Sequence, residues 1–255
     1  MRIVVPLKAV PDLVEEMELN PEHTDLDREF LKFVLNEWDD QALEEALLIK
    51  EADGAEVVVV GLSSDPDIDQ SLFTALAKGA DRAVRLDVGN PVTDSHSRAA
   101  VIADYLRQNP ADLVVTGVQA PDDLDGQLAP MVAATLDLPH VAVVTSVRAA
   151  QEAVTVRQEF SGGRSAELEV SLPAVIGIQA ARQSPRYAPI SRVRQMMQAG
   201  GIEESSTAVD TAGTGTTVRR MYAPVSSAHA EMIEGSPSEV ADRIVALLAS
   251  RGLTK

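Results

Sequence analysis

Cysteine is absent from the 255 residues of this sequence. Disulfides, thiolate metal sites and cysteine nucleophiles are therefore excluded. The four histidines are scattered without the spacing of metal ligands, which favours solvated or core positions for them. We expect no metal site in this chain.

Aromatic residues are scarce as well. They make up 3% of the chain, with a single tryptophan, whereas hydrophobic residues as a whole reach 45%. The core must therefore be built mainly from alanine, valine, leucine and isoleucine. A chain of this length allows one large domain, or one domain with an extension.

Basic residues are outnumbered by acidic ones, 22 against 39, which gives a net charge of −17. Such a surface repels phosphate backbones and anionic lipid heads, so nucleic-acid and membrane-surface binding are disfavoured, whereas a partner protein with a basic rim is allowed. No apolar run approaches the roughly 18 residues of a membrane span, and the first residues lack a cleavage-site pattern. We expect no direct membrane insertion and a cytoplasmic location.

Apolar runs and helical periodicity alternate along the first 140 residues. Runs rich in β-branched residues predict strands, and apolar residues at helical spacing predict helices between them. Asp65 is expected to cap the second helix, with Pro66 in its first turn. The alternation predicts the α/β class, with a doubly wound, mostly parallel sheet of the Rossmann-like, adenine-nucleotide-binding kind. The expected strands are 2–8, 55–62, 82–86 and 111–117, and the expected helices are 39–54, 65–79, 97–110 and 127–139.

The pattern changes after residue 150. Alternation on both sides of Ser161-Gly162-Gly163 predicts an antiparallel hairpin over 153–172, followed by a last sheet strand over 173–180. Residues 192–217 are rich in Gly, Thr and Ser and predict an extended, weakly packed segment. The last helix, 236–252, begins with the capping-box spacing of Ser236 and Glu239. We therefore expect a nucleotide-binding α/β domain over 1–190 and a C-terminal arm and helix over 191–255.

The stretch GVQAPDDLDGQLAP (117–130) links an expected strand to an expected helix. Ligands of parallel sheets bind beyond the carboxyl ends of the strands. Gly126 permits close backbone approach, and the amides of the next three residues fall in the first helical turn, where the free N–H groups and the helix dipole favour an anion. The three aspartates would cap the helix or accept hydrogen bonds from ribose hydroxyls or loop amides. The residues alone also allow a plain surface turn.

No lysine, histidine or metal-binding carboxylate pair is expected at this phosphate end. That expectation disfavours the alternative of an enzyme that hydrolyses or transfers adenine nucleotides. A third hypothesis is an AMP-binding regulatory protein. Trp38 lies just before the first long helix in a polar setting, and its sequence position allows either a core role or a functional contact.

Six stretches of the chain match one known family. On these stretches the chain resembles the β subunit of electron transfer flavoprotein over nearly its whole length. They are VVPLKAVPD, LNEWDDQALEEALLIKE, FTALAKGADRAVRL, ADLVVTGVQAPDDLDGQ, LPAVIGIQAARQSPRYAPI and IEGSPSEVADRIVALL.

The resemblance implies a subunit without catalytic residues of its own. It implies a heterodimer with an α subunit, FAD shared with that subunit, and AMP or, in electron-bifurcating members, a second FAD in the β subunit. Electrons would pass from dehydrogenases to a quinone reductase. The arm would wrap the partner and dock by a stripe on its helix formed by Val240, Ile244, Leu247 and Leu248.

The resemblance also implies site residues. Trp38 would lie beside the isoalloxazine ring held by the partner, and the segment 184–190 would be recognised by dehydrogenases through Arg186, Tyr187 and Ile190. The implied cofactor-binding residues are Pro6, Asn36, Trp38, Asp39, Leu62, Asp122, Asp123, Leu124, Asp125, Gly126, Gln127, Leu128 and Ala129.

The chain also departs from the family pattern. The family loop of the AMP type reads D-D-D-x-N-Q-T-G-Q, whereas this chain reads D-D-L-D-G-Q-L-A-P and so lacks a threonine hydroxyl for the phosphate. Leu13 stands where family members place a tyrosine near the flavin, and Ile190 replaces a leucine. These departures leave open whether AMP or FAD fills the β site.

Overall fold

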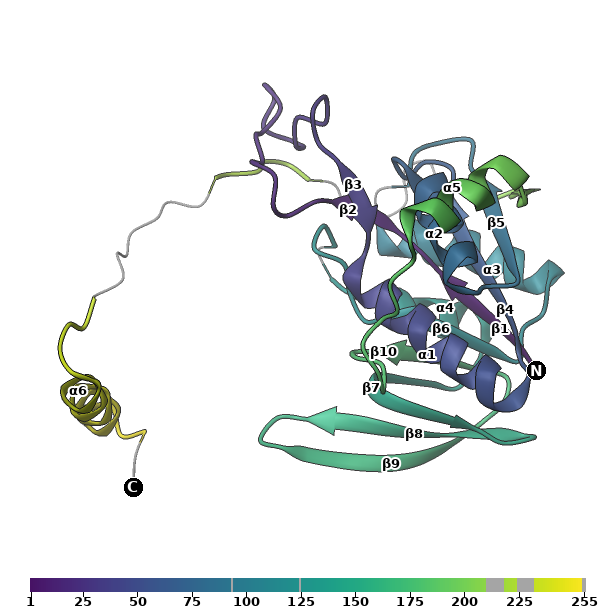
Figure 1. Cartoon of the computed structure of the whole chain (residues 1–255). Helices are drawn as coiled ribbons and strands as arrows, with labels where there is room; N and C mark the ends of the chain where they lie inside the picture. Colours follow the sequence, from purple (N-terminus) through teal and green to yellow (C-terminus); the bar gives the residue numbers. More distant parts are fainter. Residues whose placement is uncertain (93, 124, 210–217, 224–231, 254–255) are drawn as a thin grey trace.

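The computed structural model describes residues 1–92, 94–123, 125–209, 218–223 and 232–253. A nine-stranded sheet forms its centre, in the order β11-β5-β4-β1-β6-β10-β7-β8-β9 (Figure 1). The strands from β11 to β7 are parallel to their neighbours, and β7, β8 and β9 pair antiparallel. The strand bounds are β1 Arg2–Pro6, β4 Glu56–Leu62, β5 Arg82–Asp87, β6 Leu113–Gly117, β7 His140–Ala149, β8 Ala153–Phe160, β9 Arg164–Ser171, β10 Ala174–Ile178 and β11 Ile202–Ser206.

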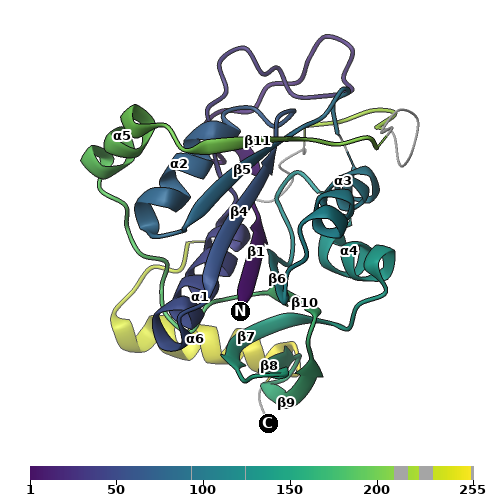
Figure 2. The same ribbon diagram turned by 90° about the vertical axis from the view of Figure 1, so that its right-hand side faces the viewer.

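Helices cover both faces of the parallel part of the sheet (Figure 2). Helices α1 (Glu37–Asp53) and α2 (Ile68–Lys78) pack on one face, and α3 (Ser95–Gln108) and α4 (Leu128–Leu136) pack on the other. Side chains of β4 alternate between the two cores: Val57 and Val59 join the first, and Val58 and Val60 the second. A continuous valine run is therefore buried on both sides, as the sequence predicts. The predicted α/β fold class is confirmed.

The start of α2 differs from the prediction. Its N-cap is Asp67, with a φ of 54°, so the helix begins after Pro66 and Asp65 does not cap it. The Asp65 carboxylate instead accepts two hydrogen bonds from Arg98 on α3, at 2.6 and 2.8 Å. The sequence predicts that Asp65 caps α2, but its side chain binds Arg98, which lies 33 residues away.

The antiparallel end of the sheet contains one strand more than expected. The predicted hairpin forms as β8 and β9, and β10 follows it as predicted. In addition β7 pairs parallel with β10 and antiparallel with β8. Because β7 is parallel to one neighbour and antiparallel to the other, it joins the doubly wound part of the sheet to the hairpin.

Residues after 190 contain more regular structure than expected. Instead of an extended segment, 192–209 include most of helix α5 (Ile190–Ala199) and strand β11, which forms the edge of the main sheet beside β5. Weak packing is confirmed for both elements, in which Val193 alone is buried. Arg82 of β5 donates two hydrogen bonds to Glu203, at 2.8 and 2.7 Å, and Arg85 pairs with Glu204. Residues 210–217 of the predicted segment lie outside the described residues. The boundary predicted at residue 190 stays a prediction.

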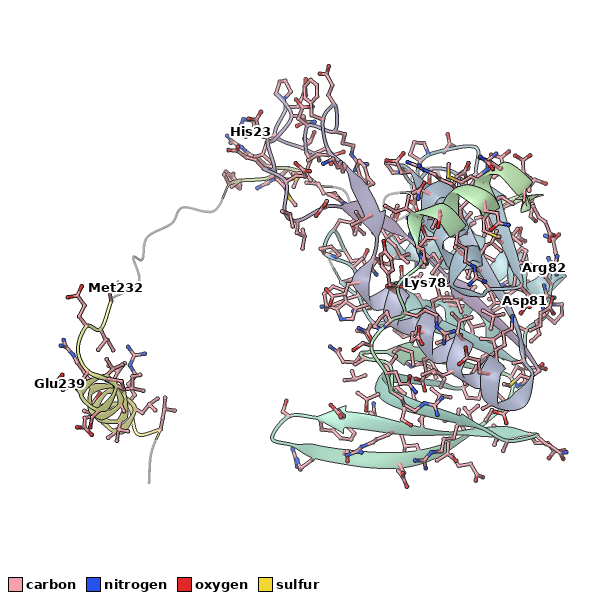
Figure 3. The ribbon with its side chains drawn as sticks, viewed as in Figure 1. His23, Lys78, Asp81, Arg82, Met232 and Glu239 are labelled. Atoms are coloured by element: carbon pink, nitrogen blue, oxygen red, sulfur yellow. The ribbon has the colours of Figure 1, made fainter. Side chains whose placement is uncertain are left out.

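The last helix, α6 (Pro237–Ser250), has the predicted capping box between Ser236 and Glu239. None of its residues is buried, and it lies apart from the sheet, with Met232 and Glu239 on this separate part of the chain (Figure 3). Its apolar stripe is therefore uncovered. None of the helices within the described residues combines the length and the apolar character needed to cross a bilayer.

A small lobe projects from the carboxyl edge of the sheet (Figure 1). It consists of the antiparallel strands β2 (Ala9–Pro11) and β3 (Phe33–Leu35) and the connection between them, which carries His23 (Figure 3). The backbone N–H of Met221 donates to the carbonyl of His23 at 2.7 Å, so the C-terminal arm contacts this lobe on its way to α6.

Candidate functional site

The candidate site lies at the carboxyl edge of the parallel strands, where the direction of winding reverses. β1 is the central strand, with β4 on one side and β6 on the other. The chain leaves β1 through the lobe for α1 on one face, whereas it leaves β6 for α4 on the other face. Such a switch point opens a crevice in which doubly wound proteins bind ligands. The loop between β6 and α4 contains the aspartates of the predicted site.

Asp39 joins two strand ends at this edge of the sheet. It lies in the first turn of α1, is 5% exposed, and accepts hydrogen bonds from the backbone N–H of Lys8 at 2.9 Å and of Gly117 at 3.2 Å. A Cβ on Gly117 would lie 2.6 Å from Asp39 Oδ1. The glycine is therefore required for the close approach of α1 to the end of β6.

Burial raises the pKa of Asp39 to about 7. Hydrogen bonds from the Asn36 side chain and the Lys8 backbone, together with the charge of Lys8, oppose this rise, and the charge of Asp123 adds to it. The effect of desolvation on the pKa exceeds these opposing effects, because water cannot stabilise the carboxylate at this depth.

Asn36 connects the start of α1 to the same loop. Its Nδ2 donates to the carbonyl of Gln119 at 2.9 Å, and its backbone N–H donates to the carbonyl of Lys8 at 2.9 Å. The side chain is buried, and its Oδ1 has no hydrogen-bond partner among the described residues. An acceptor left in this state costs free energy unless a further donor reaches it.

The loop turns into α4 through Asp125 and Gly126. Asp125 Oδ1 accepts from the backbone N–H of Gln127 at 3.1 Å and from Ser95 Oγ at 2.8 Å. It thereby binds a loop amide, one of the roles expected for the aspartates. Gly126 has a φ of 60°, and a Cβ there would lie 3.2 Å from the Cβ of Gln119. Leu124 lies outside the described residues.

The expectation that no lysine lies at this end of the sheet is wrong. Lys8, two residues beyond β1, reaches the loop and pairs through Nζ with Asp122 Oδ1 at 2.7 Å and Asp123 Oδ1 at 2.8 Å. Its side chain is 14% exposed. The sequence placed Lys8 at a strand end but gave no sign of its partners, which lie 114 and 115 residues away.

A second cation, Arg98, was also missed. Its bidentate pair with Asp65 is buried, and burial disfavours the charged guanidinium. The charge and hydrogen bonds of Asp65, with smaller contributions from Asp123 and Asp122, nevertheless hold the pKa of Arg98 above its ordinary value. Two cations and their carboxylates thus form an ion-pair network beside the loop.

The structure brings most of the expected cofactor-binding residues to one edge. Pro6 and Leu62 end β1 and β4, but both are buried, so their side chains belong to the core. Trp38 is half-buried in the first turn of α1. Leu128 and Ala129 open α4, in the first helical turn, whose N–H groups have no acceptor within the helix.

The residues expected to bind partner proteins lie on another surface. Arg186 donates through its backbone N–H to Glu44 Oε2 at 2.9 Å and through Nη2 to Glu44 Oε1 at 2.8 Å, and it also pairs with Glu51. These contacts fasten it to α1. Tyr187 and Ile190, which follow it, are 78% and 63% exposed.

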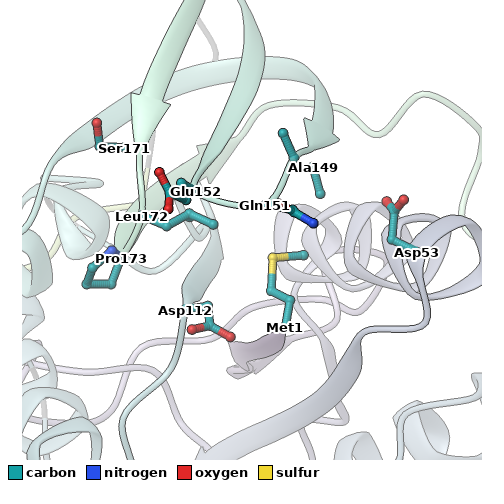
Figure 4. Close-up of a pocket in the computed structure, with 10 residues that line it drawn as sticks. Met1, Asp53, Asp112, Ala149, Gln151, Glu152, Ser171, Leu172 and Pro173 are labelled. Carbon is teal, nitrogen blue, oxygen red and sulfur yellow. The ribbon is translucent and has the colours of Figure 1, made fainter.

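A separate hollow of about 900 Å³ lies at the opposite edge of the sheet (Figure 4). It is lined by residues at the amino ends of β1, β6 and β10 and at the end of α1, among them Met1, Asp112, Pro173 and Asp53. Its position at the amino edge places it away from the switch point and from every residue of the predicted cofactor site.

Comparison with known proteins agrees with this architecture. The family model described as electron transfer flavoprotein domain matches residues 26–211. The chain is 37% identical over 260 residues to an electron transfer flavoprotein subunit beta of Methylophilus methylotrophus, covering 97% of this chain and 98% of the relative. It is 30% identical to the subunit beta of Clostridium acetobutylicum, with 97% and 98% covered, and 30% identical to that of Sus scrofa, with 76% of each covered. The chain therefore belongs to the electron transfer flavoprotein family, and the relatives that it resembles over most of its length are β subunits.

Proposed function

We propose that this chain is the β half of a heterodimeric electron transfer flavoprotein and that it holds an adenine nucleotide at the carboxyl edge of its sheet. The named relatives are β subunits, which supports an α subunit as the partner. The observation that carries the nucleotide proposal is the meeting, at the switch point, of a glycine-opened loop with the first turn of α4.

The chemistry of the residues fits an adenine nucleotide. The amides at the start of α4 would bind the phosphate, as helix N-termini do for anions. The side-chain oxygen of Asn36, which has no partner within the part of the chain that the structure describes, lies at the same edge, and a hydroxyl or amino group of the ligand would supply its missing donor. Asp39 would position the strand ends without contact to the nucleotide, because its carboxylate is already bound by two backbone amides.

We further propose that redox FAD is shared with the α subunit and that AMP or a second FAD fills the β site. FAD supplies the electron-carrying chemistry when it is bound. The residues of this chain would hold and orient the cofactor and contact the partner proteins. Trp38 would lie beside the isoalloxazine ring, and Tyr187 and Ile190 would face dehydrogenases. Tyr187 and Ile190 are exposed and therefore accessible to a partner. Transfer onward to a quinone reductase and the cytoplasmic location stay predictions.

The alternative of a nucleotide-hydrolysing enzyme is not favoured. Lys8 removes one argument against it, since a lysine does reach the loop. However, this lysine is engaged by two carboxylates, and no cluster of three or more histidine, aspartate or glutamate side chains among the described residues could hold a metal ion. The family assignment also points to electron transfer.

Purification of the native complex tests the proposal. The complex, denatured after gel filtration, should release one FAD and one AMP per pair of subunits, or two FAD, as separated and counted by liquid chromatography. A colourless chain that purifies alone and hydrolyses ATP would overturn the proposal. AMP bound without a flavin partner would support the regulatory hypothesis instead.

A further inference from the structure

Lys8 is held at the base of the loop by hydrogen bonds of both its main chain and its side chain. Its backbone N–H donates to Asp39 and its carbonyl accepts from the N–H of Asn36, both at 2.9 Å. The main chain of Lys8 is thus fixed to the first turn of α1. Its side chain extends to Asp122 and Asp123, whose carboxylates it joins at 2.7 and 2.8 Å.

Negative charge dominates the surroundings of the proposed phosphate position. Five carboxylates lie around the loop: Asp122 and Asp123 pair with Lys8, Asp65 pairs with Arg98, and Asp39 and Asp125 accept hydrogen bonds from uncharged groups. Arg98 is committed to Asp65 by two hydrogen bonds, and Asp125 is bound to Gln127 and Ser95. Lys8 is therefore the cation that pairs directly with Asp122 and Asp123.

We propose that Lys8 is a positioning residue for nucleotide binding, which holds Asp122 and Asp123 against the end of β1 so that the start of α4 can accept a phosphate. Lys8 acts on the carboxylates and does not contact the phosphate. The inference rests on the proposed function. Without the lysine, two uncompensated carboxylates in the loop would repel the phosphate dianion in a partly buried site, where Coulomb interactions are weakly screened.

Lys8 could contact the phosphate directly or could neutralise Asp122 and Asp123. These two roles predict opposite nucleotide affinities for a variant that lacks the lysine and both carboxylates. If Lys8 bound the phosphate directly, removal of Asp122 and Asp123 as well would leave the lost contact unrepaired. If Lys8 acts by neutralising the two carboxylates, their removal makes the lysine unnecessary. The triple variant Lys8→Met, Asp122→Asn, Asp123→Asn therefore separates the two roles. It also removes the charge of both partners in each Lys8 ion pair, so that neither Asp122 nor Asp123 is left as an unpaired charge.

The test uses the full chain with its co-purifying subunit, freed of nucleotide and titrated calorimetrically with AMP, or with FAD if wild type prefers FAD. We expect Lys8→Met to weaken binding by about tenfold or more. The triple variant should return within about threefold of wild type, because asparagine at positions 122 and 123 keeps a side-chain oxygen that can accept a hydrogen bond from the ligand. Lys32→Met is the matched control, since this lysine is 74% exposed and pairs with Glu15 in the lobe. It should leave affinity unchanged.

A triple variant as weak as Lys8→Met, or Lys8→Met with wild-type affinity, would overturn the inference. The triple variant distinguishes the two roles even if Lys8→Met does not fold. If Lys8 contacts the phosphate directly, the triple variant must bind the nucleotide at least about tenfold more weakly than wild type. Adenosine, which lacks a phosphate, should bind wild type and all folded variants alike. Failure of wild type to bind AMP or FAD would refute the proposed function, whatever the variants do.

Discussion

Asp39 Oδ1 lies 3.2 Å from the backbone nitrogen of Gly117, at the last residue of β6. This contact joins the first turn of the longest sheet-packed helix, α1, to the strand that leads into the loop of the proposed nucleotide site. The same carboxylate accepts from the N–H of Lys8, after β1. One buried side chain thus sets the separation of the two strand ends at the switch point.

Gly117→Ala should strain this junction. The added Cβ would lie 2.6 Å from Asp39 Oδ1 and 2.7 Å from the backbone carbon of Trp38, so α1 must shift. We expect unfolding free energy to fall by about 1–3 kcal/mol, as for other overpacked sites, with weaker nucleotide binding. Urea denaturation measures the first effect. Gly89→Ala is the control, because a Cβ there meets nothing within 4 Å, and an equal loss in both variants would contradict the account.

The unfolding free energy of the protein should depend on pH through Asp39. Its folded-state pKa, about 7, lies above the value of about 3.9 in an unfolded chain. The folded state therefore binds more protons between about pH 4 and pH 7. The stability contributed by protonated Asp39 is fully present below about pH 4 and is lost as pH rises through 7.

Comparison with Asp39→Asn isolates this contribution. The unfolding free energy of wild type minus that of the variant should decrease from pH 4 to pH 7.5, by at most about 1.4 kcal/mol per pH unit. Denaturant titrations across this range provide the values. A difference that increased with pH would show that the carboxylate is stabilised, and not destabilised, by its surroundings.

Glu44→Gln should loosen the segment that precedes Tyr187. Glu44 is 3% exposed and accepts from both the backbone and the guanidinium of Arg186. Loss of its charge leaves the arginine only partly compensated, and we expect a destabilisation of about 1–3 kcal/mol. Hydrogen exchange should quicken over residues 181–190.

Glu51→Gln is the matched variant for Glu44→Gln. Glu51 also pairs with Arg186, but its side chain is 56% exposed, so the pair is largely solvated. Its exchange profile should stay close to wild type. Similar exchange in the two variants would show that the buried carboxylate does not hold the segment.

Leu247→Asp should prevent assembly with the α subunit while leaving the α/β body intact. No residue of α6 is buried, so a change there removes no packing from the sheet. Val245→Asp is the control, because Val245 is more exposed than Leu247 and lies off the predicted docking stripe. Co-purification with a tagged α subunit measures the effect. Equal recovery of the partner with both variants would argue against docking by this stripe.

Local pattern in the sequence is sufficient for most elements of the doubly wound core and for the last helix. The valine run of β4 and the capping box of α6 are such signals, since their determinants lie within a few residues. The edge strand β11 reads IEESS and has a single apolar residue, so it carries no strand signal of its own. It is held by Arg82 and Arg85 of the neighbouring strand, 121 and 119 residues away.

In the candidate site, too, some features follow from local sequence and others depend on contacts between distant segments. The position of the loop and the role of Gly126 follow from local sequence, because a strand end, a glycine and a helix start are adjacent there. The ion pairs of Lys8 and Arg98 do not, because each joins segments that only the fold brings together. The charge balance at the loop was therefore misjudged although its backbone was placed correctly.

A crystal structure of the chain with its partner and excess AMP would test the central claim most directly. The account predicts the phosphate within hydrogen-bond distance of the backbone N–H groups of Leu128 and Ala129, beside Gly126. A nucleotide bound elsewhere, for example in the hollow at the amino edge, or a loop that stays closed by its own side chains, would contradict it.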